Sequence, residues 1–294
     1  MLAVVGTVPD PDFPMVQGVV SMDRGMLSIA GHRIEVCRGT PALLASALQT
    51  SDTLGIPPPR AFLAGDIGLG HGSRRLYAYL AEHLQHLACD VLLFHYLQPD
   101  VDWHNKVLFA VQDMPVRPLL VADAGFMYAA KMSGQAPEYD LFTPDVGELA
   151  FLADETAPHP FYTRGFILHE DNKVPDLIRR AYLHHNAAGN LLVKGIHDIV
   201  ANSKGILAEV HSPSLPALEA MGGTGDTLTG LVGSLLDSGM DVVQASRIAA
   251  LVNREAGLLA RPTPATQVRE VVARIPEALQ QLLSREKDSL VDAR

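Results

Sequence analysis

Residues 221–239, MGGTGDTLTGLVGSLLDSG, place three glycines directly before an aspartate and an amphipathic helix. Because glycine has no Cβ, this backbone can turn tightly and approach a ligand closely. A helix beginning near Thr224 would direct its unpaired N–H groups and the positive end of its dipole into the turn, which makes an anion site. Asp226 adds a carboxylate beside that site, so the pattern predicts a phosphate site with a base or orienting group. A glycine-rich turn in which Asp226 only caps the helix is the simpler alternative.

Other polar residues stand at the ends of short apolar segments. RAFLAGD (60–66), RPLLVAD (117–123), YDLFTPD (139–145) and LLVKG (191–195) each run from apolar into polar sequence. The polar residues at these ends are Asp66, Asp123, Thr143 and Lys194. In open α/β sheets ligands bind beyond the carboxyl ends of the strands, so we expect the site at this edge.

The elements that must position these residues follow an alternating order. Alternation over residues 16–22 and 26–36, with a turn at 30–32, predicts an N-terminal β-hairpin. From Gly39 onward short strands alternate with helices, which is typical of a mostly parallel sheet covered on both faces. We therefore expect one three-layer α/β domain spanning residues 1–294.

Helix starts are marked by their own residues. In the helix that begins near residue 39, Thr40 is a candidate cap and the proline after it suits the first turn. In LFTPDVGELAFL (141–152), Thr143 can cap, a proline follows, and Asp145 and Glu148 favour the positive end of a helix. Beyond residue 224 the sequence predicts helices over 224–237, 241–260 and 266–284.

Several familiar sites are not indicated. AGDIGLGHGS (64–73) lacks both G-x-G-x-x-G and the Lys-Ser/Thr of a P-loop, so we interpret it as a glycine loop lining a pocket or as a plain turn. His83 with His86, and His184 with His185, do not have zinc-site spacing, and no metal ligand set is predicted. No nucleophile elbow indicates a Ser-His-Asp site.

Composition limits the class of protein. The hydrophobic content is 48% and the charged content 19%, which suits a folded domain with a sizeable core. A formal charge of −10 argues against nucleic acid or an anionic membrane as partner. Cys37 and Cys89 are expected to be reduced thiols in the core. No apolar run approaches 18 residues and no signal-peptide pattern opens the chain, so we expect a cytoplasmic protein.

Taken in order, these segments resemble the ribokinase-like superfamily, and within it the ADP/ATP-dependent NAD(P)H-hydrate dehydratases. The glycines before Asp226 resemble the G-T-G-D anion hole of the superfamily. The segments that carry the remaining resemblance are GTPALLASAL (39–48), IGLGHGS (67–73), LLVADAG (119–125), LFTPDVGELAFL (141–152), LLVKGIHDIVAN (191–202) and REVVARIPEALQQLL (269–283). The resemblance covers about residues 39–284 and implies a ribokinase-like three-layer fold.

The resemblance also implies roles for residues. Amides of Gly223, Thr224 and Gly225 would hold the terminal phosphate of ADP or ATP, with Mg²⁺ bridging phosphate oxygens, and Asp226 would accept or orient the acceptor hydroxyl. The residues implied along the nucleotide are Lys194, Gly195, His197, Asp198 and Gly225. The residues implied for the substrate are Thr40, Gly70, Asp123, Asp145 and Asp226.

The chain departs from the family on the substrate side. Asp145 stands where the family has a histidine in T-P-H-P-G-E, and the loop at residues 66–70 reads D-I-G-L-G instead of G-P-G-L-G. The segment from His95 to Pro115 has no counterpart that the resemblance names. The implied activity is repair of hydrated NAD(P)H, in which the ring hydroxyl is phosphorylated and then leaves as phosphate. A small-molecule kinase of the same superfamily, acting on a vitamin precursor or a sugar, and a non-catalytic nucleotide-binding relative are the alternatives. Exposed edge strands permit a homo-oligomer, which we expect.

Overall fold

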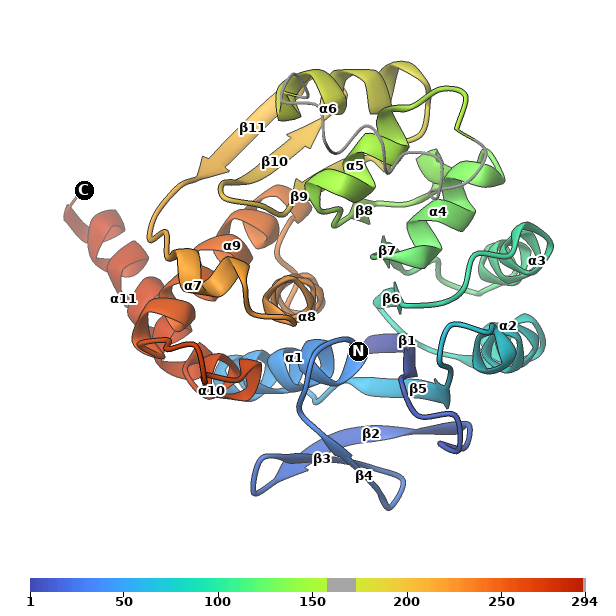
Figure 1. Ribbon diagram of the computed structural model, residues 1–294, viewed down its shortest axis with the longest axis horizontal. Coiled ribbons are helices and arrows are strands. Elements are labelled where there is room, and N and C mark those ends of the chain that lie inside the picture. Colours follow the sequence, from blue (N-terminus) through green and yellow to red (C-terminus); the bar gives the residue numbers. More distant parts are fainter. Residues whose placement is uncertain (158–172, 293–294) are drawn as a thin grey trace.

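Strands at the centre of the sheet are buried along their whole length. In the computed structural model, which describes residues 1–157 and 173–292, β1 (Leu2–Val8) and β6 (Val91–His95) are buried at every position. Strands buried on both faces need helices above and below them. The chain accordingly forms three layers, with the sheet between two groups of helices (Figure 1).

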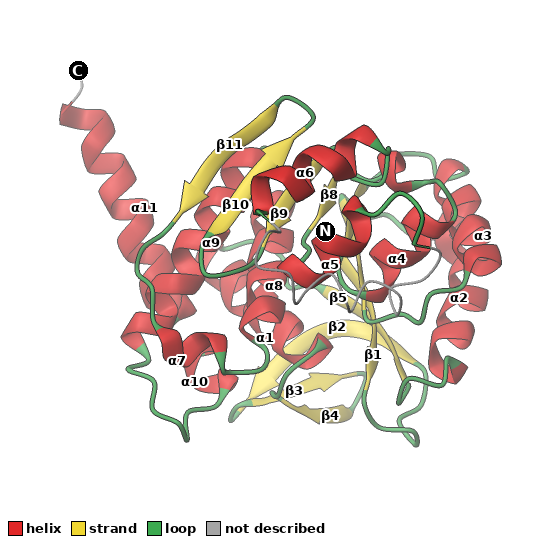
Figure 2. Ribbon diagram, turned by 45° about the horizontal axis from the view of Figure 1, so that its top comes forward, coloured by secondary structure: helices red, strands yellow, loops and turns green. Residues whose placement is uncertain are grey.

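Within the described residues, eleven strands form one sheet in the order β11-β10-β9-β8-β7-β6-β1-β5-β2-β3-β4. Neighbours from β9 to β5 pair in parallel, whereas β10 and β11 at one edge and β2, β3 and β4 at the other pair antiparallel. Figure 2 shows these two antiparallel sets at opposite sides of the molecule. The other strands are β2 (Val16–Asp23), β3 (Met26–Ile29), β4 (His32–Glu35), β5 (Arg60–Gly65), β7 (Leu119–Ala122), β8 (Leu141–Phe142), β9 (Asn190–Val193), β10 (Asp198–Asn202) and β11 (Gly205–Val210).

Helices divide between the two faces. On one face the core is formed with α1 (Thr40–Leu54), α8 (Thr224–Asp237), α9 (Val242–Leu259), α10 (Val268–Val272) and α11 (Ile275–Asp292). On the other face it is formed with α2 (His71–His83), α3 (Val101–Gln112), α4 (Gly125–Met132), α5 (Val146–Ala153) and α6 (Val174–Leu183). The short elements are α7 (Pro216–Glu219) and the 3₁₀ turns at Leu84–His86 and Ala136–Glu138.

Close packing of α1 against α8 brings distant parts of the chain to the same edge of the sheet. A Cβ at Gly230 would lie 2.2 Å from the carbonyl oxygen of Leu43, so the two helix backbones touch where glycine is present. Ser46 donates a hydrogen bond of 2.6 Å to the carbonyl of Thr227 in the same contact. The start of α8 is thereby fixed next to the start of α1.

The fold confirms the mostly parallel three-layer sheet and the N-terminal hairpin. Strands β3 and β4 turn at residues 30–31, and β2 joins the hairpin to the main sheet through antiparallel pairing with β5. The helices predicted at 224–237 and 241–260 are α8 and α9, whereas the segment predicted at 266–284 is divided into α10 and α11. The central position of β1, between β5 and β6, was not apparent from its sequence.

Both threonine caps that we predicted are wrong. Gly39, with a φ of 80°, is the N-cap of α1, and Thr40 is a helical residue whose hydroxyl contacts His95 instead. Asp145 is the N-cap of α5 because its carboxylate accepts the Glu148 N–H, while Glu148 accepts the Asp145 N–H. This is a capping box shifted by two residues from Thr143.

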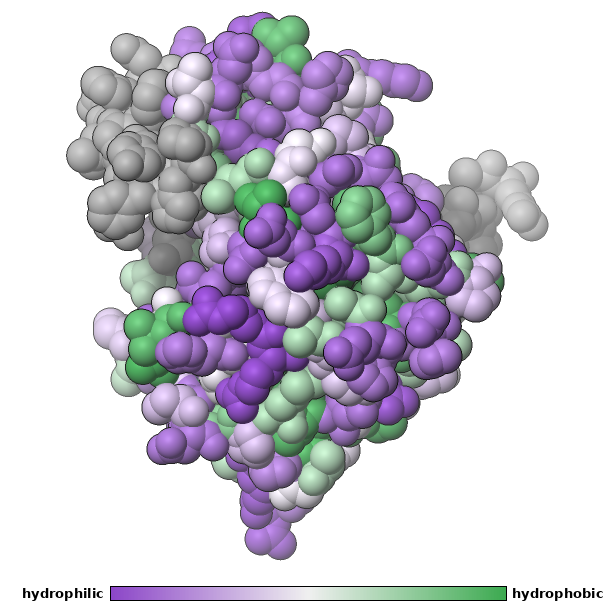
Figure 3. Space-filling view, turned by 90° about the vertical axis from the view of Figure 1, so that its right-hand side faces the viewer, coloured by the Kyte–Doolittle hydropathy of each residue, from purple (hydrophilic) through white to green (hydrophobic). Residues whose placement is uncertain are grey.

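Cys37 is exposed, so its predicted place in the core is wrong, whereas Cys89 is buried and both thiols are free. Cys37 lies in the exposed connection between β4 and α1, outside the sheet. Among the described residues, none of the helices has the length and apolar character needed to cross a membrane. On the face that shows in Figure 3, hydrophobic residues form several small groups among hydrophilic ones.

Candidate functional site

The glycine turn leaves the start of α8 open to a ligand. Gly223 is the N-cap, with a φ of 107° that favours glycine, and no side chain caps the helix. The first backbone hydrogen bond of α8 runs from the Thr227 N–H to the Gly223 carbonyl at 2.9 Å. The amides before Thr227 therefore have no helical acceptor and can bind an anion. Asn253 of α9 holds this turn by donating to the Thr224 carbonyl at 3.0 Å.

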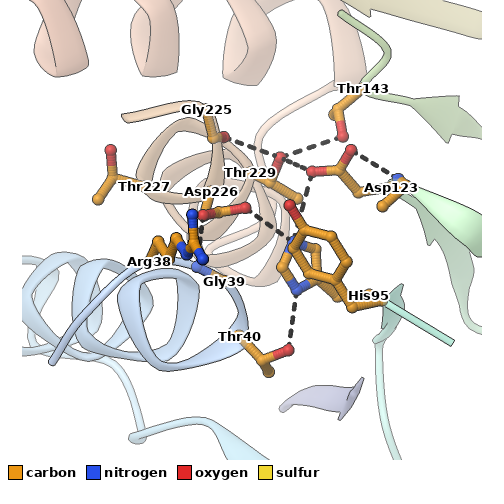
Figure 4. A network of polar contacts seen from close by, with 12 residues as sticks. Arg38, Gly39, Thr40, His95, Asp123, Thr143, Gly225, Asp226, Thr227 and Thr229 are labelled. Carbon is orange, nitrogen blue, oxygen red and sulfur yellow. Dashed lines mark hydrogen bonds and ion pairs between the residues drawn. The ribbon is translucent and has the colours of Figure 1, made fainter. Parts of the chain in front are cut away.

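Asp226 lies in the first turn of α8 with both carboxylate oxygens held. Oδ2 accepts the Gly39 N–H at 2.6 Å, and Oδ1 lies 3.1 Å from His95 Nε2 (Figure 4). Burial alone would raise the pKa of Asp226, but the hydrogen bond and charge of His95, the Gly39 amide and Lys194 outweigh it and lower that pKa. The lowered pKa keeps the carboxylate ionised. Asp226 is 8% exposed and lines the cavity described below, so a ligand can reach it.

His95, at the end of β6, is the main residue of the site that the sequence did not reveal. It is completely buried, and its Nδ1 lies 3.0 Å from Thr40 Oγ1 while Nε2 faces Asp226. The Nε2 atom also lies 3.8 Å from Asp123 Oδ2. The available signal was a histidine at the end of a strand, comparable to Asp123 directly after β7, because ligand sites form beyond strand ends in this class of sheet.

Asp123 and Lys194 form an ion pair beside the anion turn. Lys194 Nζ contacts both oxygens of Asp123, at 2.8 and 2.9 Å. Thr229 of α8 donates to Asp123 Oδ2 at 2.6 Å and its Oγ1 lies 3.1 Å from that of Thr143. Burial opposes the charge of Lys194, but Asp123, Glu148 and Asp226 together raise its pKa, so the lysine is a cation. A Cβ placed on Gly225 would lie 3.7 Å from this ammonium, so a positive charge stands next to the open amides.

A cavity of about 570 Å³ opens onto these groups. Its lining includes a set of polar and charged side chains, the turn at the start of α8 and a set of apolar side chains. The polar and charged residues are Tyr96, Asp123, Asp145, Glu148 and Lys194, the turn is Gly223, Thr224, Gly225 and Asp226, and the apolar residues are Pro213, Leu215, Leu218 and Val271. Burial raises the pKa of Glu148 to about 8, with Lys194 opposing the shift and Asp123 and Asp145 adding to it. The cavity lining therefore combines carboxylates, an anion-binding turn and apolar side chains.

A buried ion pair supports the wall of the cavity. Arg254 Nε contacts Asp198 Oδ2 at 2.6 Å, and its Nη2 donates to the carbonyls of Gly195 and Ile196, both at 2.9 Å. Nη1 reaches the carbonyl of Pro213 at 3.2 Å. Because Arg254 is 9% exposed and its donors are taken by the protein, it joins the two loops on that side of the cavity.

Not every predicted site residue lines this cavity. The amide of Gly70, together with those of Gly68 and Leu69, donates to Asp66 Oδ1 at 3.0 Å, so the glycine loop binds its own carboxylate. His197 lies beside His211, with ring centroids 4.3 Å apart and ring planes tilted by 57°, and lines a neighbouring cavity. Thr40 reaches the site only through His95. The residues that the structure does bring to the cavity are Asp123, Asp145, Lys194, Gly195, Asp198, Gly223, Thr224, Gly225 and Asp226.

Comparison with known proteins places the chain in a family. Residues 99–277 match the carbohydrate-kinase family that is described as NAD(P)H-hydrate dehydratase. The chain belongs to the NAD(P)H-hydrate dehydratase family. The matched residues include β7, the Lys194 strand and all of α8, and thus the whole anion site with Asp226.

The share of the chain that aligns, and the share of the relative that it covers, differ from one relative to another. An uncharacterized protein of Methanocaldococcus jannaschii is 37% identical over 242 residues, which are 82% of this chain and 100% of that protein. The bifunctional NAD(P)H-hydrate repair enzyme Nnr of Pyrobaculum aerophilum is 32% identical over 117 residues, which are 40% of this chain and only 20% of that enzyme.

Solved structures of low sequence identity share the fold. The ADP/ATP-dependent NAD(P)H-hydrate dehydratase of Bacillus subtilis, co-crystallized with ATP/Mg²⁺, aligns with a TM-score of 0.59 at 14% identity, over 95% of this chain and 88% of that one. Phosphofructokinase-2 of Escherichia coli aligns with a TM-score of 0.54 at 12% identity, over 95% of this chain and 100% of that one. The dehydratase family and the sugar kinase thus have the same three-layer architecture.

Proposed function

We propose that this protein is a nucleotide-dependent dehydratase that repairs hydrated NADH or NADPH. The observation that carries the proposal is Asp226, an ionised carboxylate held at the open N-terminus of α8 inside a cavity. A base next to an anion hole is what transfer of a phosphoryl group to a hydroxyl requires. The family of the chain supplies the substrate class.

The turn at the start of α8 and the residues around it would bind the nucleotide. The open amides at residues 224–226 and the ammonium of Lys194 would hold the phosphate that is transferred, because both favour negative charge that grows there. The apolar side chains of Leu215, Leu218 and Val271 in the cavity lining would take the base of ADP or ATP.

Asp226 performs the proton transfer in this proposal. It takes the proton of the ring hydroxyl as the hydroxyl oxygen attacks the terminal phosphorus, and the bond from that phosphorus to the nucleotide breaks. The C–O bond of the resulting phosphate ester then breaks, phosphate leaves with the bonding pair, and loss of a proton from the neighbouring ring carbon restores the reduced nicotinamide. His95 and Gly39 hold the Asp226 carboxylate in one orientation, in which it can accept the proton of the attacking hydroxyl.

Mg²⁺ fits this site as a companion of the nucleotide. Among the described residues, no group of three or more His, Cys, Asp or Glu side chains could hold a metal ion by itself. Mg²⁺ in phosphoryl-transfer sites is bound through one or two carboxylates, phosphate oxygens and water. Asp145 and Glu148 line the cavity and would provide such carboxylates. Burial chiefly raises the pKa of Glu148, and a bound cation would offset the further contribution that the charges of Asp123 and Asp145 make.

A small-molecule kinase is the second candidate. It is favoured by Asp145, which lines the cavity and stands where the resemblance to the family places a histidine. The ionised Asp226 beside an open anion hole argues against a relative without catalysis.

The test is incubation with hydrated NADH or NADPH and either ADP or ATP, with Mg²⁺. A dehydratase restores the absorbance of reduced nicotinamide and releases one phosphate per turnover. A kinase would instead accumulate a stable phosphate ester on another hydroxyl compound. Nucleotide binding with no turnover of either kind would contradict both candidates.

We further propose that the protein acts in the cytoplasm as a homo-oligomer, with no nucleic-acid partner. Light scattering on the purified protein tests the assembly.

A further inference from the structure

Tyr96, the residue after His95, has an unusual backbone and an unusual exposure. Its φ is 53°, in the left-handed region that bulky residues avoid, and its side chain is 48% exposed within the wall of the cavity. Such a conformation costs of order 1 kcal/mol or more and is kept where surrounding contacts enforce it. Here the Thr7 hydroxyl enforces it by donating to the Tyr96 carbonyl at 2.7 Å.

The loop that carries Tyr96 is fixed at a second point. The Gln98 N–H donates to Ser73 Oγ at 3.0 Å, and the Tyr77 hydroxyl donates to the Gln98 carbonyl at 2.7 Å. Both partners belong to α2. The aromatic ring is therefore presented to the cavity by a rigid loop rather than by a mobile one.

The ring of Tyr96 stands next to the catalytic carboxylate. Its centroid lies 4.4 Å from that of His95, at an angle of 79°, and a Cβ on Gly39 would lie 3.8 Å from its Cε2 atom. Gly39 and His95 are the two residues that hold Asp226. A planar group stacked on Tyr96 therefore has its substituents within reach of the Asp226 carboxylate.

The hydroxyl of Tyr96 is available to a ligand. No residue in the described part of the chain forms a hydrogen bond with it. Burial, together with the charges of Asp226 and Asp123, raises the pKa of Tyr96, so the phenol is protonated and can donate at neutral pH. A ring with a polar tip is the combination that binds an aromatic or partly reduced heterocycle with polar substituents.

We propose that Tyr96 binds the ring that bears the reacting hydroxyl, by stacking on it and orienting that hydroxyl toward Asp226. The inference rests on the proposed function, because it takes the acceptor to be the hydrated nicotinamide ring. The apolar side chains of Leu215, Leu218 and Val271 in the same cavity are left for the base of the nucleotide.

The test compares Tyr96→Gly and Tyr96→Phe with the wild-type protein. Glycine removes the ring and also relieves the left-handed backbone, so we expect a folded variant whose Tm does not fall. The KM of this variant for hydrated NADH or NADPH should rise about tenfold, while its Kd for ATP stays unchanged. Tyr96→Phe should keep the stack and show a smaller rise.

His185→Gly is the matched control, because His185 is an exposed aromatic residue with a φ of 57° outside the cavity. It should leave KM for both substrates unchanged. An unchanged acceptor KM in Tyr96→Gly, or a Kd for ATP that rises equally, would overturn the inference while the proposed function stands. A wild-type protein that neither binds nor converts hydrated NADH or NADPH would overturn both.

Discussion

His95 and Asp226 meet at 3.1 Å although 131 residues separate them in the chain. The histidine ends a central parallel strand and the aspartate lies in the first turn of α8, so the contact joins the sheet to the helix that carries the anion site. Because His95 is completely buried, it cannot touch a ligand and acts only through the carboxylate that it holds. The relationship makes His95 a positioning residue for the base.

Asp226→Asn should bind nucleotide but lose most activity. The amide keeps the shape of the carboxylate, so the turn and the anion hole stay in place, but it cannot accept the hydroxyl proton. General-base catalysis contributes about 10²–10⁴-fold, and we expect kcat to fall by that order. Calorimetric titration with ATP and a turnover assay measure the two properties. A variant that turns over at nearly the wild-type rate would show that another group is the base.

Replacing His95 should move the acidic limb of the pH profile. Burial would raise the pKa of Asp226, and His95 is the first of the groups that lower it. The base must be ionised to accept a proton, and without His95 the pKa of Asp226 should be higher. As the pH falls, His95→Ala should therefore lose activity at a higher pH than the wild-type enzyme does. His95→Gln, which can keep a donor near Asp226 without a charge, should lie between the two.

The measurement is kcat/KM against pH, with the Tm recorded for each variant. A purely structural role for His95 predicts lower stability and lower activity with an unchanged acidic limb. That result would refute the positioning role.

Sequence patterns within single segments predicted the anion turn, Asp226 and Lys194. They did not predict His95 and Gly39, which long-range packing brings to Asp226. The glycines and Asp226 occur within a few residues of one another, and Lys194 directly follows a strand, so sequence patterns were sufficient to find them. His95 and Gly39 reach Asp226 only because β6 and α1 lie beside α8, which no pattern within a segment encodes. The glycine loop at 67–70 was misleading because its sequence resembles a ligand-binding loop. In the structure the amides of residues 68–70 donate to the carboxylate of Asp66, in the same segment, instead of to a ligand.

The two glycines of the anion turn should respond differently to alanine. A Cβ on Gly225 would lie 3.5 Å from Lys194 Cδ, an ordinary contact, but it would fill the space between the open amides and the ammonium. We expect Gly225→Ala to fold normally and to raise the Kd for ATP at least tenfold. A Cβ on Gly223 would lie 3.0 Å from Val268 and the residue has a φ of 107°, so Gly223→Ala should lower the free energy of unfolding by about 1–3 kcal/mol.

Urea unfolding and ATP titration of both variants separate these effects. If Gly225→Ala bound ATP as tightly as the wild-type protein, the phosphate would lie elsewhere in the cavity. Equal destabilisation of the two variants would contradict the difference in backbone that the structure shows.

Arg254 should be the stability-determining residue of the cavity wall. Arg254→Met leaves Asp198 buried without its cation and takes a donor from three carbonyls, those of Gly195, Ile196 and Pro213. Breaking a buried ion pair on one side costs about 3–5 kcal/mol, and we expect a loss of that order in the free energy of unfolding. The double variant Arg254→Met/Asp198→Asn should recover part of the loss, since it removes the uncompensated charge.

Arg269→Met is the control for that prediction, because Arg269 pairs with Glu35 at 3.1 Å on the surface, where both side chains are more than half exposed. Exposed pairs contribute about 0–1 kcal/mol, so its unfolding curve should nearly overlay that of the wild-type protein. Similar losses for Arg254→Met and Arg269→Met would mean that burial does not strengthen the Arg254 pair. Asp198 Oδ1 also accepts the Gly195 N–H at 3.2 Å, a bond that the side-chain oxygen introduced by Asp198→Asn can keep. A double variant less stable than Arg254→Met would therefore show that the uncompensated charge of Asp198 does not cause the loss.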